Sequence, residues 1–176
     1  MYSAMKDRDI KKIVVHHSGS RVLKGMDNPA LVEFRHKLRG FDEIGYHYII
    51  GNGKLTNDGE VYVGRDVEKV GAHAYGHNYD SIGIALIGNF NFEHPTEKQR
   101  ENLIKLIRDK SKRYNILLEE VYGHRELDNT ETECPGRNFD MDKLREELII
   151  GRRKLEKEFR ENYRISRIVN EDAFSL

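Results

Sequence analysis

A nearly continuous apolar run, Ser81-Ile82-Gly83-Ile84-Ala85-Leu86-Ile87-Gly88, constrains the fold more than any other stretch of the chain. A strand that is buried on only one face usually alternates apolar and polar residues, and this run does not alternate. We therefore predict a strand near the centre of a sheet, covered on both faces. The two glycines of the run indicate close packing or a bulge.

Four shorter segments also have the composition of strands: residues 10–15, 46–50, 60–65 and 116–122. In the second of them, strand alternation would place Tyr46 and Tyr48 on one face and His47 on the other. Residues 71–80 are rich in Gly, His and Asn, and they predict an exposed loop of the kind that often binds polar ligands.

Helix start signals follow Asn28 and Thr96. Asn28-Pro29 supplies an N-cap and a first-turn proline for a helix that ends at Gly40, in which His36 is interpreted as a packing residue. Thr96 and Gln99 have capping-box spacing for a helix over about residues 96–113. A further helix is expected after Asp140, continuing to about residue 163 as a charged helix. We expect a single catalytic domain over 1–150 and a charged helical extension and tail over 151–176.

The charge balance narrows the class of protein. The 176 residues carry 30 basic and 30 acidic side chains, which argues against a general nucleic-acid binder. A single cysteine rules out an internal disulfide framework. No apolar run approaches the ~20 residues of a membrane span, and the N-terminus lacks the apolar core of a signal peptide. We expect a protein made in the cytoplasm that would need another route for export.

The only cysteine, Cys134, follows His124 across a polar loop, and His124 follows a predicted strand. Such a pair has three readings: both residues bind zinc, the imidazole activates a thiol nucleophile, or the cysteine is simply a small buried hydrophobe. A second histidine pair, His16-His17, ends the first predicted strand. Because adjacent strand residues face opposite sides, only one histidine of this pair can enter a given site.

Taken with His16, the two residues would give zinc two nitrogens and one sulfur, leaving a position for water. The metal would lower the pKa of that water toward ~7 and so prepare it to attack a carbonyl. A hydroxyl from Tyr46 or Thr132 would stabilise the oxyanion that develops.

Six motifs occur in this order: Val15-His16-His17-Ser18-Gly19, Gly45-Tyr46-His47-Tyr48-Ile49-Ile50, Gly71-Ala72-His73 with Gly76-His77-Asn78, Ser81-Ile82-Gly83-Ile84, Gly123-His124-Arg125-Glu126 and Thr132-Glu133-Cys134-Pro135-Gly136. Together they resemble the zinc-dependent N-acetylmuramoyl-L-alanine amidase family, which includes bacteriophage lysozyme-type amidases and peptidoglycan recognition proteins. The resemblance covers about residues 10–148.

The resemblance implies an α/β fold: a central mixed β-sheet flanked by helices, with zinc at the base of an open cleft. It implies His16, His124 and Cys134 as metal ligands, Tyr46 as the catalytic tyrosine, and His73 and Asn78 as residues lining the muramyl-peptide groove. Thr132 stands where some phage members have lysine and active recognition-type amidases have threonine. The implied reaction hydrolyses the amide between the lactyl group of N-acetylmuramic acid and L-alanine.

Three functions are compatible with these residues. The first is this zinc amidase. The second is a non-catalytic peptidoglycan-binding module on the same fold; members that only bind commonly lack the cysteine ligand, which this chain keeps. The third is a cysteine amidase using Cys134 with His124, which the position of the cysteine beside Pro135 does not favour.

By analogy, a lone catalytic domain suggests a phage endolysin, a bacteriolytic and antimicrobial enzyme that reaches the cell wall through a holin or similar pore. We expect a monomer that acts on peptidoglycan after release. The basic residues within 152–167 predict either a solvated helix or an arm that contacts anionic cell surfaces.

Overall fold

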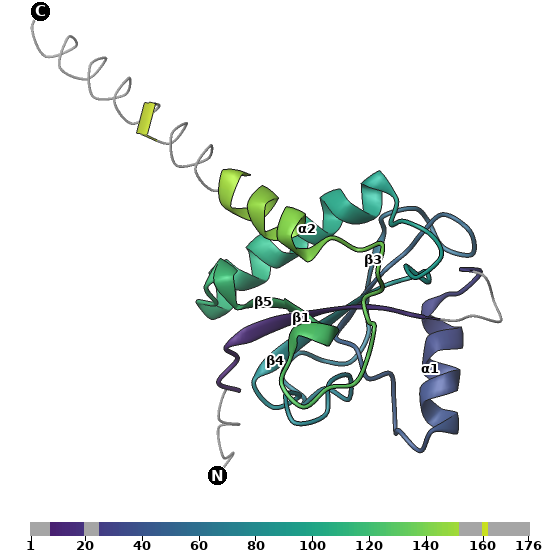
Figure 1. Ribbon diagram of the computed structural model, residues 1–176. Helices are drawn as coiled ribbons and strands as arrows, with labels where there is room; N and C mark the ends of the chain where they lie inside the picture. Colours follow the sequence, from purple (N-terminus) through teal and green to yellow (C-terminus); the bar gives the residue numbers. More distant parts are fainter. Residues whose placement is uncertain (1–7, 20–24, 152–159, 162–176) are drawn as a thin grey trace, which may run out of the picture.

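The computed structural model describes residues 8–19, 25–151 and 160–161, and within them a five-stranded mixed sheet carries helices on both faces (Figure 1). The sheet order is β3-β2-β4-β1-β5. The pairs β2–β4, β4–β1 and β1–β5 are parallel, and only β3 is antiparallel to its neighbour. The strands are β1 Lys12–His17, β2 Tyr48–Ile50, β3 Val61–Val63, β4 Ser81–Leu86 and β5 Val121–Gly123. The predicted α/β fold with a central mixed sheet is confirmed.

The apolar run over residues 81–88 contains the middle strand, β4. All six of its residues are buried, because β1 and β2 pair with its two edges and side chains cover both faces. No helix in the described part of the chain is both long and apolar enough to span a membrane.

The helices begin where the sequence predicts. Asn28 caps α1 (Pro29–Leu38) by accepting a hydrogen bond from Leu31 N at 2.9 Å. Thr96 and Gln99 form the capping box of α2 (Glu97–Tyr114). Residues 141–151 are helical, and Asp140 accepts from Lys143 N at 2.8 Å at the start of that helix.

Two apolar layers hold these helices to opposite faces of the sheet. On one face, Leu103 and Ile107 of α2 and Leu144 and Leu148 of the helix over 141–151 pack into the largest core cluster. On the other face, Val32 of α1 packs with a smaller cluster made of Ile44, Ile49 and Ile87. The sheet is therefore buried on both faces, as the continuous apolar run of β4 requires.

The predicted strand over 116–122 is mostly wrong. Leu118–Glu120 form a 3₁₀ turn, and only Val121–Gly123 pair with β1. The chain leaves α2 through Asn115, whose φ of 54° lies in the left-handed region, and then turns onto the edge of the sheet. Ile116, just before this turn, and Leu118 within it pack into the large core, so their apolar character reflects burial rather than strand pairing.

The predicted shared face of Tyr46 and Tyr48 is also wrong. Tyr46 precedes β2, so the strand alternation does not extend to it. Tyr46 packs with Ile49 in the smaller cluster under α1, whereas Tyr48 packs against the large core on the other face.

The loop over 71–80 is exposed only in part: Tyr75 is 93% exposed, but His73 and Ala74 are buried. The predicted continuation of the charged helix to about residue 163, and the basic stretch within 152–167, lie outside the described residues except for 160–161.

Candidate metal centre

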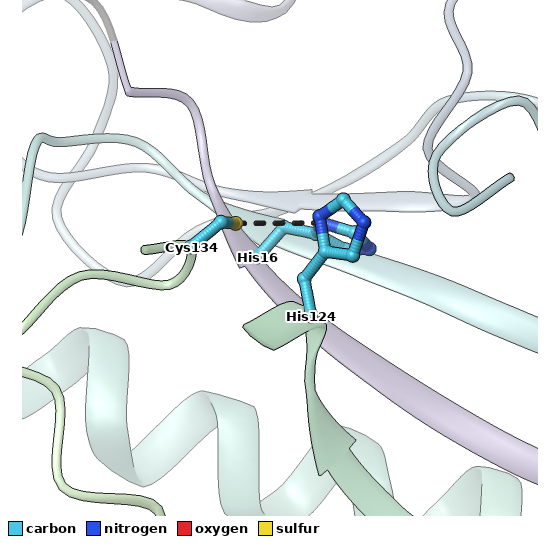
Figure 2. A group of neighbouring side chains, drawn as sticks. All are labelled: His16, His124 and Cys134. Carbon is cyan, nitrogen blue, oxygen red and sulfur yellow. Dashed lines mark hydrogen bonds between the residues drawn. The ribbon is translucent and has the colours of Figure 1, made fainter. Parts of the chain in front are cut away.

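Three side chains from distant parts of the sequence meet at one edge of the sheet (Figure 2). One ligand atom each from His16, His124 and Cys134 lies within 4.8 Å of the other two. The His16 Nδ1 to Cys134 Sγ distance is 3.5 Å. The structure thus brings together the three residues that the sequence predicted as metal ligands.

The register of the parallel strands explains how the two histidines meet. Val15 of β1 pairs with Gly123 of β5, so His16 and His124 directly follow paired residues. Their ring centroids are 4.6 Å apart. Parallel strands bring their carboxyl ends to the same edge of a sheet, which is where ligand sites of open α/β folds form.

Strand alternation also decides which histidine of the pair faces the site. His16 points to the side of Tyr46, with ring centroids 5.1 Å apart. His17 points toward the large core, where its Nδ1 accepts a hydrogen bond from Phe90 N at 3.0 Å. His17 still serves the centre through its backbone, because its N–H donates to Cys134 Sγ at 3.5 Å.

Arg125, the residue after His124, holds the loop that carries Cys134 beside His124. The Arg125 N–H donates to Cys134 O at 2.7 Å. The Arg125 guanidinium donates to Gly136 O at 2.6 Å and to Phe139 O at 2.9 Å. The turn that carries His124 and the loop that carries Cys134 are thereby held against each other.

The donor set and its surroundings fit Zn²⁺. A tetrahedral zinc with ordinary bond lengths would place nitrogen and sulfur ligands about 3.6 Å apart, close to the 3.5 Å between His16 Nδ1 and Cys134 Sγ. Burial lowers the pKa of His16 well below its usual value, and burial is also the main reason for the lowered pKa of His124. Both imidazoles are therefore neutral at pH 7 and keep a lone pair for a metal.

The thiol needs a cation in order to ionise. Burial raises the pKa of Cys134 to about 12, despite opposing effects of the His17 N–H and of Arg125. A thiol with so high a pKa is almost entirely protonated at pH 7. A metal ion would supply the missing positive charge, whereas the surrounding protein alone does not activate Cys134 as a free nucleophile.

The three residues open onto a cavity of ≈ 510 Å³. The lining side chains are largely neutral or aromatic, and the cavity includes Tyr46, Thr132, His73 and Asn78. Among the described lining residues, Arg39 alone carries a permanent charge. The cavity therefore favours a polar ligand with some negative charge.

The two predicted catalytic hydroxyls have different surroundings. Burial is the main cause of the raised pKa of Tyr46, so its hydroxyl stays protonated and can donate a hydrogen bond. The Thr132 hydroxyl oxygen accepts from Cys134 N at 3.2 Å, so Thr132 helps to shape the cysteine loop. A catalytic role for Thr132 stays a prediction.

The two predicted groove residues make mainly internal contacts. Asn78 Oδ1 accepts from His73 N and from Ala74 N, both at 2.8 Å, and so closes the loop on itself. The His73 ring turns inward, with its Nδ1 3.0 Å from His16 Nε2. Burial lowers the pKa of His73 well below its usual value.

Sequence reasoning missed several lining residues, among them His36, Arg39 and Phe41. His36 is buried, as its interpretation as a packing residue required, and its Nδ1 accepts from Gly45 N at 2.9 Å. All three residues lie in the last turn of α1 or just after it. Their position at the end of this predicted helix is the signal that could have identified them.

Comparisons with known proteins agree with the family resemblance seen in the sequence. A family profile described as N-acetylmuramoyl-L-alanine amidase matches residues 6–137. A peptidoglycan recognition protein from Trichoplusia ni is 42% identical over 98 residues, which cover 55% of this chain and 50% of that protein. An N-acetylmuramoyl-L-alanine amidase from Sus scrofa is 36% identical over 113 residues, covering 61% of this chain and 17% of that protein.

A solved structure has the same fold. The N-acetylmuramoyl-L-alanine amidase LysC from Clostridium intestinale superimposes with a TM-score of 0.70 at 35% identity, covering 84% of this chain and 93% of that one. The chain spans about half the length of the Trichoplusia ni relative. The family profile, the fold and the convergent His, His and Cys residues agree, and the chain belongs to the N-acetylmuramoyl-L-alanine amidase family.

Proposed function

We propose that this protein is a zinc-dependent hydrolase that cleaves the amide between N-acetylmuramic acid and L-alanine in peptidoglycan. The observation that carries the proposal is the meeting of His16, His124 and Cys134 at an open cavity. When bound by these residues, zinc would act as a Lewis acid and lower the pKa of water toward ~7.

Tyr46 would act on the carbonyl side of the scissile amide. Its hydroxyl stays protonated because burial raises its pKa, so it can donate a hydrogen bond to the carbonyl oxygen as negative charge develops there. The ring lies between His16 and His36, with centroid distances of 5.1 and 5.2 Å, which limits its movement. A donor held in place before the reaction stabilises charge without reorganisation.

Arg39 would hold the peptide side of the substrate. Its guanidinium stands among cavity-lining groups that carry no other permanent charge in the described chain. A carboxylate on a peptide is the complementary group, and guanidinium pairs with carboxylate through two parallel hydrogen bonds. This contact would orient the peptide stem and leave the amide beside the ligand cluster.

A non-catalytic peptidoglycan-binding module is the second candidate, because several relatives are named as recognition proteins. Two features of this chain favour catalysis. All three ligating residues are present and close together, and burial raises the pKa of Cys134, so a metal ion would be needed to hold it as a thiolate. Binding without hydrolysis would need neither feature.

The test measures zinc content and bond cleavage on the same preparation. The wild-type protein is expected to bind one zinc per chain and to release new L-alanine amino groups from purified peptidoglycan. A strong chelator should abolish the release, added zinc should restore it, and thiol alkylation of the zinc-loaded protein should have little effect.

His16→Ala should remove both zinc and activity, while His94→Ala, at an exposed histidine that does not line the cavity, serves as the matched control. Release of amino groups by metal-free protein would refute the zinc mechanism. Peptidoglycan binding with no release by the zinc-loaded protein would favour the recognition module.

A role in bacterial lysis, with action on the cell wall after release by a phage, is the biological setting that we propose. The basic residues within 152–167 would then contact the anionic cell surface. Replacing Arg152, Arg153 and Lys154 together by glutamine should lower lysis of whole cells and leave activity on purified wall unchanged. Equal loss on both substrates would contradict the surface contact.

A further inference from the structure

The His73 ring fills a space that two glycines leave open. A Cβ atom added at Gly71 would lie 2.5 Å from His73 Cδ2, and one added at Gly83 of β4 would collide with the same ring. His73 is only 9% exposed, and Asn78 fixes its backbone. A polar ring in such a confined place must have its nitrogens paired, since an unpaired buried polar group is costly.

Both nitrogens of His73 do have partners. Its Nδ1 lies 3.0 Å from His16 Nε2, and its Nε2 lies 3.5 Å from Ser81 Oγ. The Ser81 hydroxyl in turn donates to His77 O at 2.5 Å. These contacts form a chain of four groups that runs from the loop at residue 77 to the candidate metal ligand His16.

The carbonyl at the end of the chain sets the direction of every bond in it. A carbonyl oxygen can only accept, so the single hydroxyl proton of Ser81 is committed to His77 O. Ser81 Oγ must then accept from His73, which places the proton of that neutral ring on Nε2. His73 Nδ1 is consequently an acceptor, and the partner that can donate to it is His16 Nε2–H.

This order leaves a bare nitrogen at the candidate metal centre. A neutral imidazole with its proton on Nε2 has its lone pair on Nδ1, and His16 Nδ1 is the atom that lies 3.5 Å from Cys134 Sγ. The opposite tautomer of His16 would point an N–H at the position where a metal must bind. The hydrogen-bond chain therefore selects the binding-competent tautomer.

We propose that His73 is a positioning residue: together with Ser81 and the His77 carbonyl, it fixes the tautomer and ring orientation of His16 before any metal arrives. This inference deepens the proposed function and rests on it, because it takes His16 as a zinc ligand. Partners of this kind orient metal-ligating histidines, and their loss typically costs about 10–100-fold in metal affinity.

The first test measures the dissociation constant for zinc by chelator competition in wild type, His73→Phe and Ser81→Ala. Phenylalanine keeps an aromatic ring between the two glycines but cannot accept a hydrogen bond, so we expect zinc binding about 10–100-fold weaker. Ser81→Ala should weaken it less, because His73 keeps its contact with His16. His94→Phe makes the same chemical change at an exposed site and should bind zinc as wild type does.

The second test needs no variant, and so remains decisive even if His73→Phe does not fold. Nitrogen-detected NMR of the metal-free wild-type protein should find His16 protonated on Nε2 and bare on Nδ1. A proton on Nδ1 of His16 would overturn the inference, as would zinc affinity in folded His73→Phe within twofold of wild type. A wild-type protein that binds no zinc would instead overturn the proposed function, and this inference with it.

Discussion

At the scale of single residues, Tyr46→Phe is the sharpest change, because it removes one hydroxyl and keeps the ring that packs beside His16. We expect kcat to fall by about 10²–10³, the usual cost of losing one donor to a developing oxyanion. Zinc content should not change. Tyr79→Phe, at a tyrosine that is 69% exposed and does not line the cavity, is the matched control. An activity close to wild type in Tyr46→Phe would remove this residue from the mechanism.

Arg39→Ala should act on substrate binding rather than on chemistry. Removal of the permanent charge from the cavity lining should raise KM several-fold with a small change in kcat, and the effect should shrink as salt screens the contact. Arg39→Lys should retain part of the binding, since charge remains but the two parallel hydrogen bonds do not. Steady-state kinetics at two salt concentrations checks this, with Arg137→Ala, at an exposed arginine outside the lining, as control. Loss of kcat alone would contradict the assignment.

What the sequence could predict about single residues follows from strand alternation. Alternation predicted that only one of His16 and His17 could enter the site. His17 packs beside Phe90 on the opposite face, so His16 is the residue that enters it. The inward turn of His73 could not be predicted, because it depends on space left by Gly71 and Gly83 after the sheet has formed. Composition alone predicts that a loop rich in Gly and His is exposed. It does not show which of its side chains pack against the neighbouring strand.

At the scale of elements, the N-terminus of α2 contacts the ends of two strands, and Thr96 caps this N-terminus. Its Oγ1 accepts from Gln99 N at 3.0 Å and donates to Asp58 Oδ1 at 2.5 Å. Gln99 also donates to Ile50 O and Ile87 O, beside the ends of β2 and β4. Thr96→Ala should therefore cost about 1 kcal/mol in the free energy of unfolding, within the 0.5–2 range for lost N-caps.

Urea unfolding measures that cost, and Thr96→Ser, which keeps the hydroxyl, should recover most of it. Zinc affinity and kcat should stay at wild-type values, because Thr96 does not line the cavity. A change in zinc affinity as large as the change in stability would mean that the capping box also shapes the metal centre.

Elements with explicit end signals were the ones that sequence predicted well. Asn28-Pro29 and the Thr96–Gln99 pair fix helix starts through local hydrogen bonds, and both are confirmed. The segment over 116–122 failed because its apolar residues reach the core from a 3₁₀ turn. Hydrophobic composition reports burial, and in a short segment burial alone does not distinguish a strand from a turn.

At the scale of the whole molecule, the strand order creates the site. Sequence motifs supplied the candidate ligands, but neither composition nor periodicity states that β1 lies between β4 and β5. That order brings His16 and His124 to neighbouring positions, although 107 residues separate them in the chain. The resemblance to known amidases supplied this long-range information in advance, which is why the metal centre was predicted more completely than its hydrogen-bonded surroundings.

The whole molecule should also lose stability as the pH falls from about 7 toward 4. Burial lowers the pKa of His17 and of His47 to about 4, and it also lowers the pKa of His16 and of His73 well below the usual value. Unfolding restores an ordinary pKa near 6.5, so the unfolded chain binds more protons between the two values. The free energy of unfolding therefore rises with pH through this window: the contribution is complete above about pH 6.5 and is lost as the pH falls toward 4.

Urea unfolding of metal-free protein at pH 7, 6 and 5 measures this dependence, and the midpoint should fall at each step. In His47→Gln the slope of stability against pH should be shallower, because one histidine with a lowered pKa is gone, whereas the control His94→Gln changes an exposed histidine and should leave the slope unchanged. A midpoint that does not move between pH 7 and pH 5 would mean that the buried histidines become protonated in the folded state as readily as in the unfolded chain.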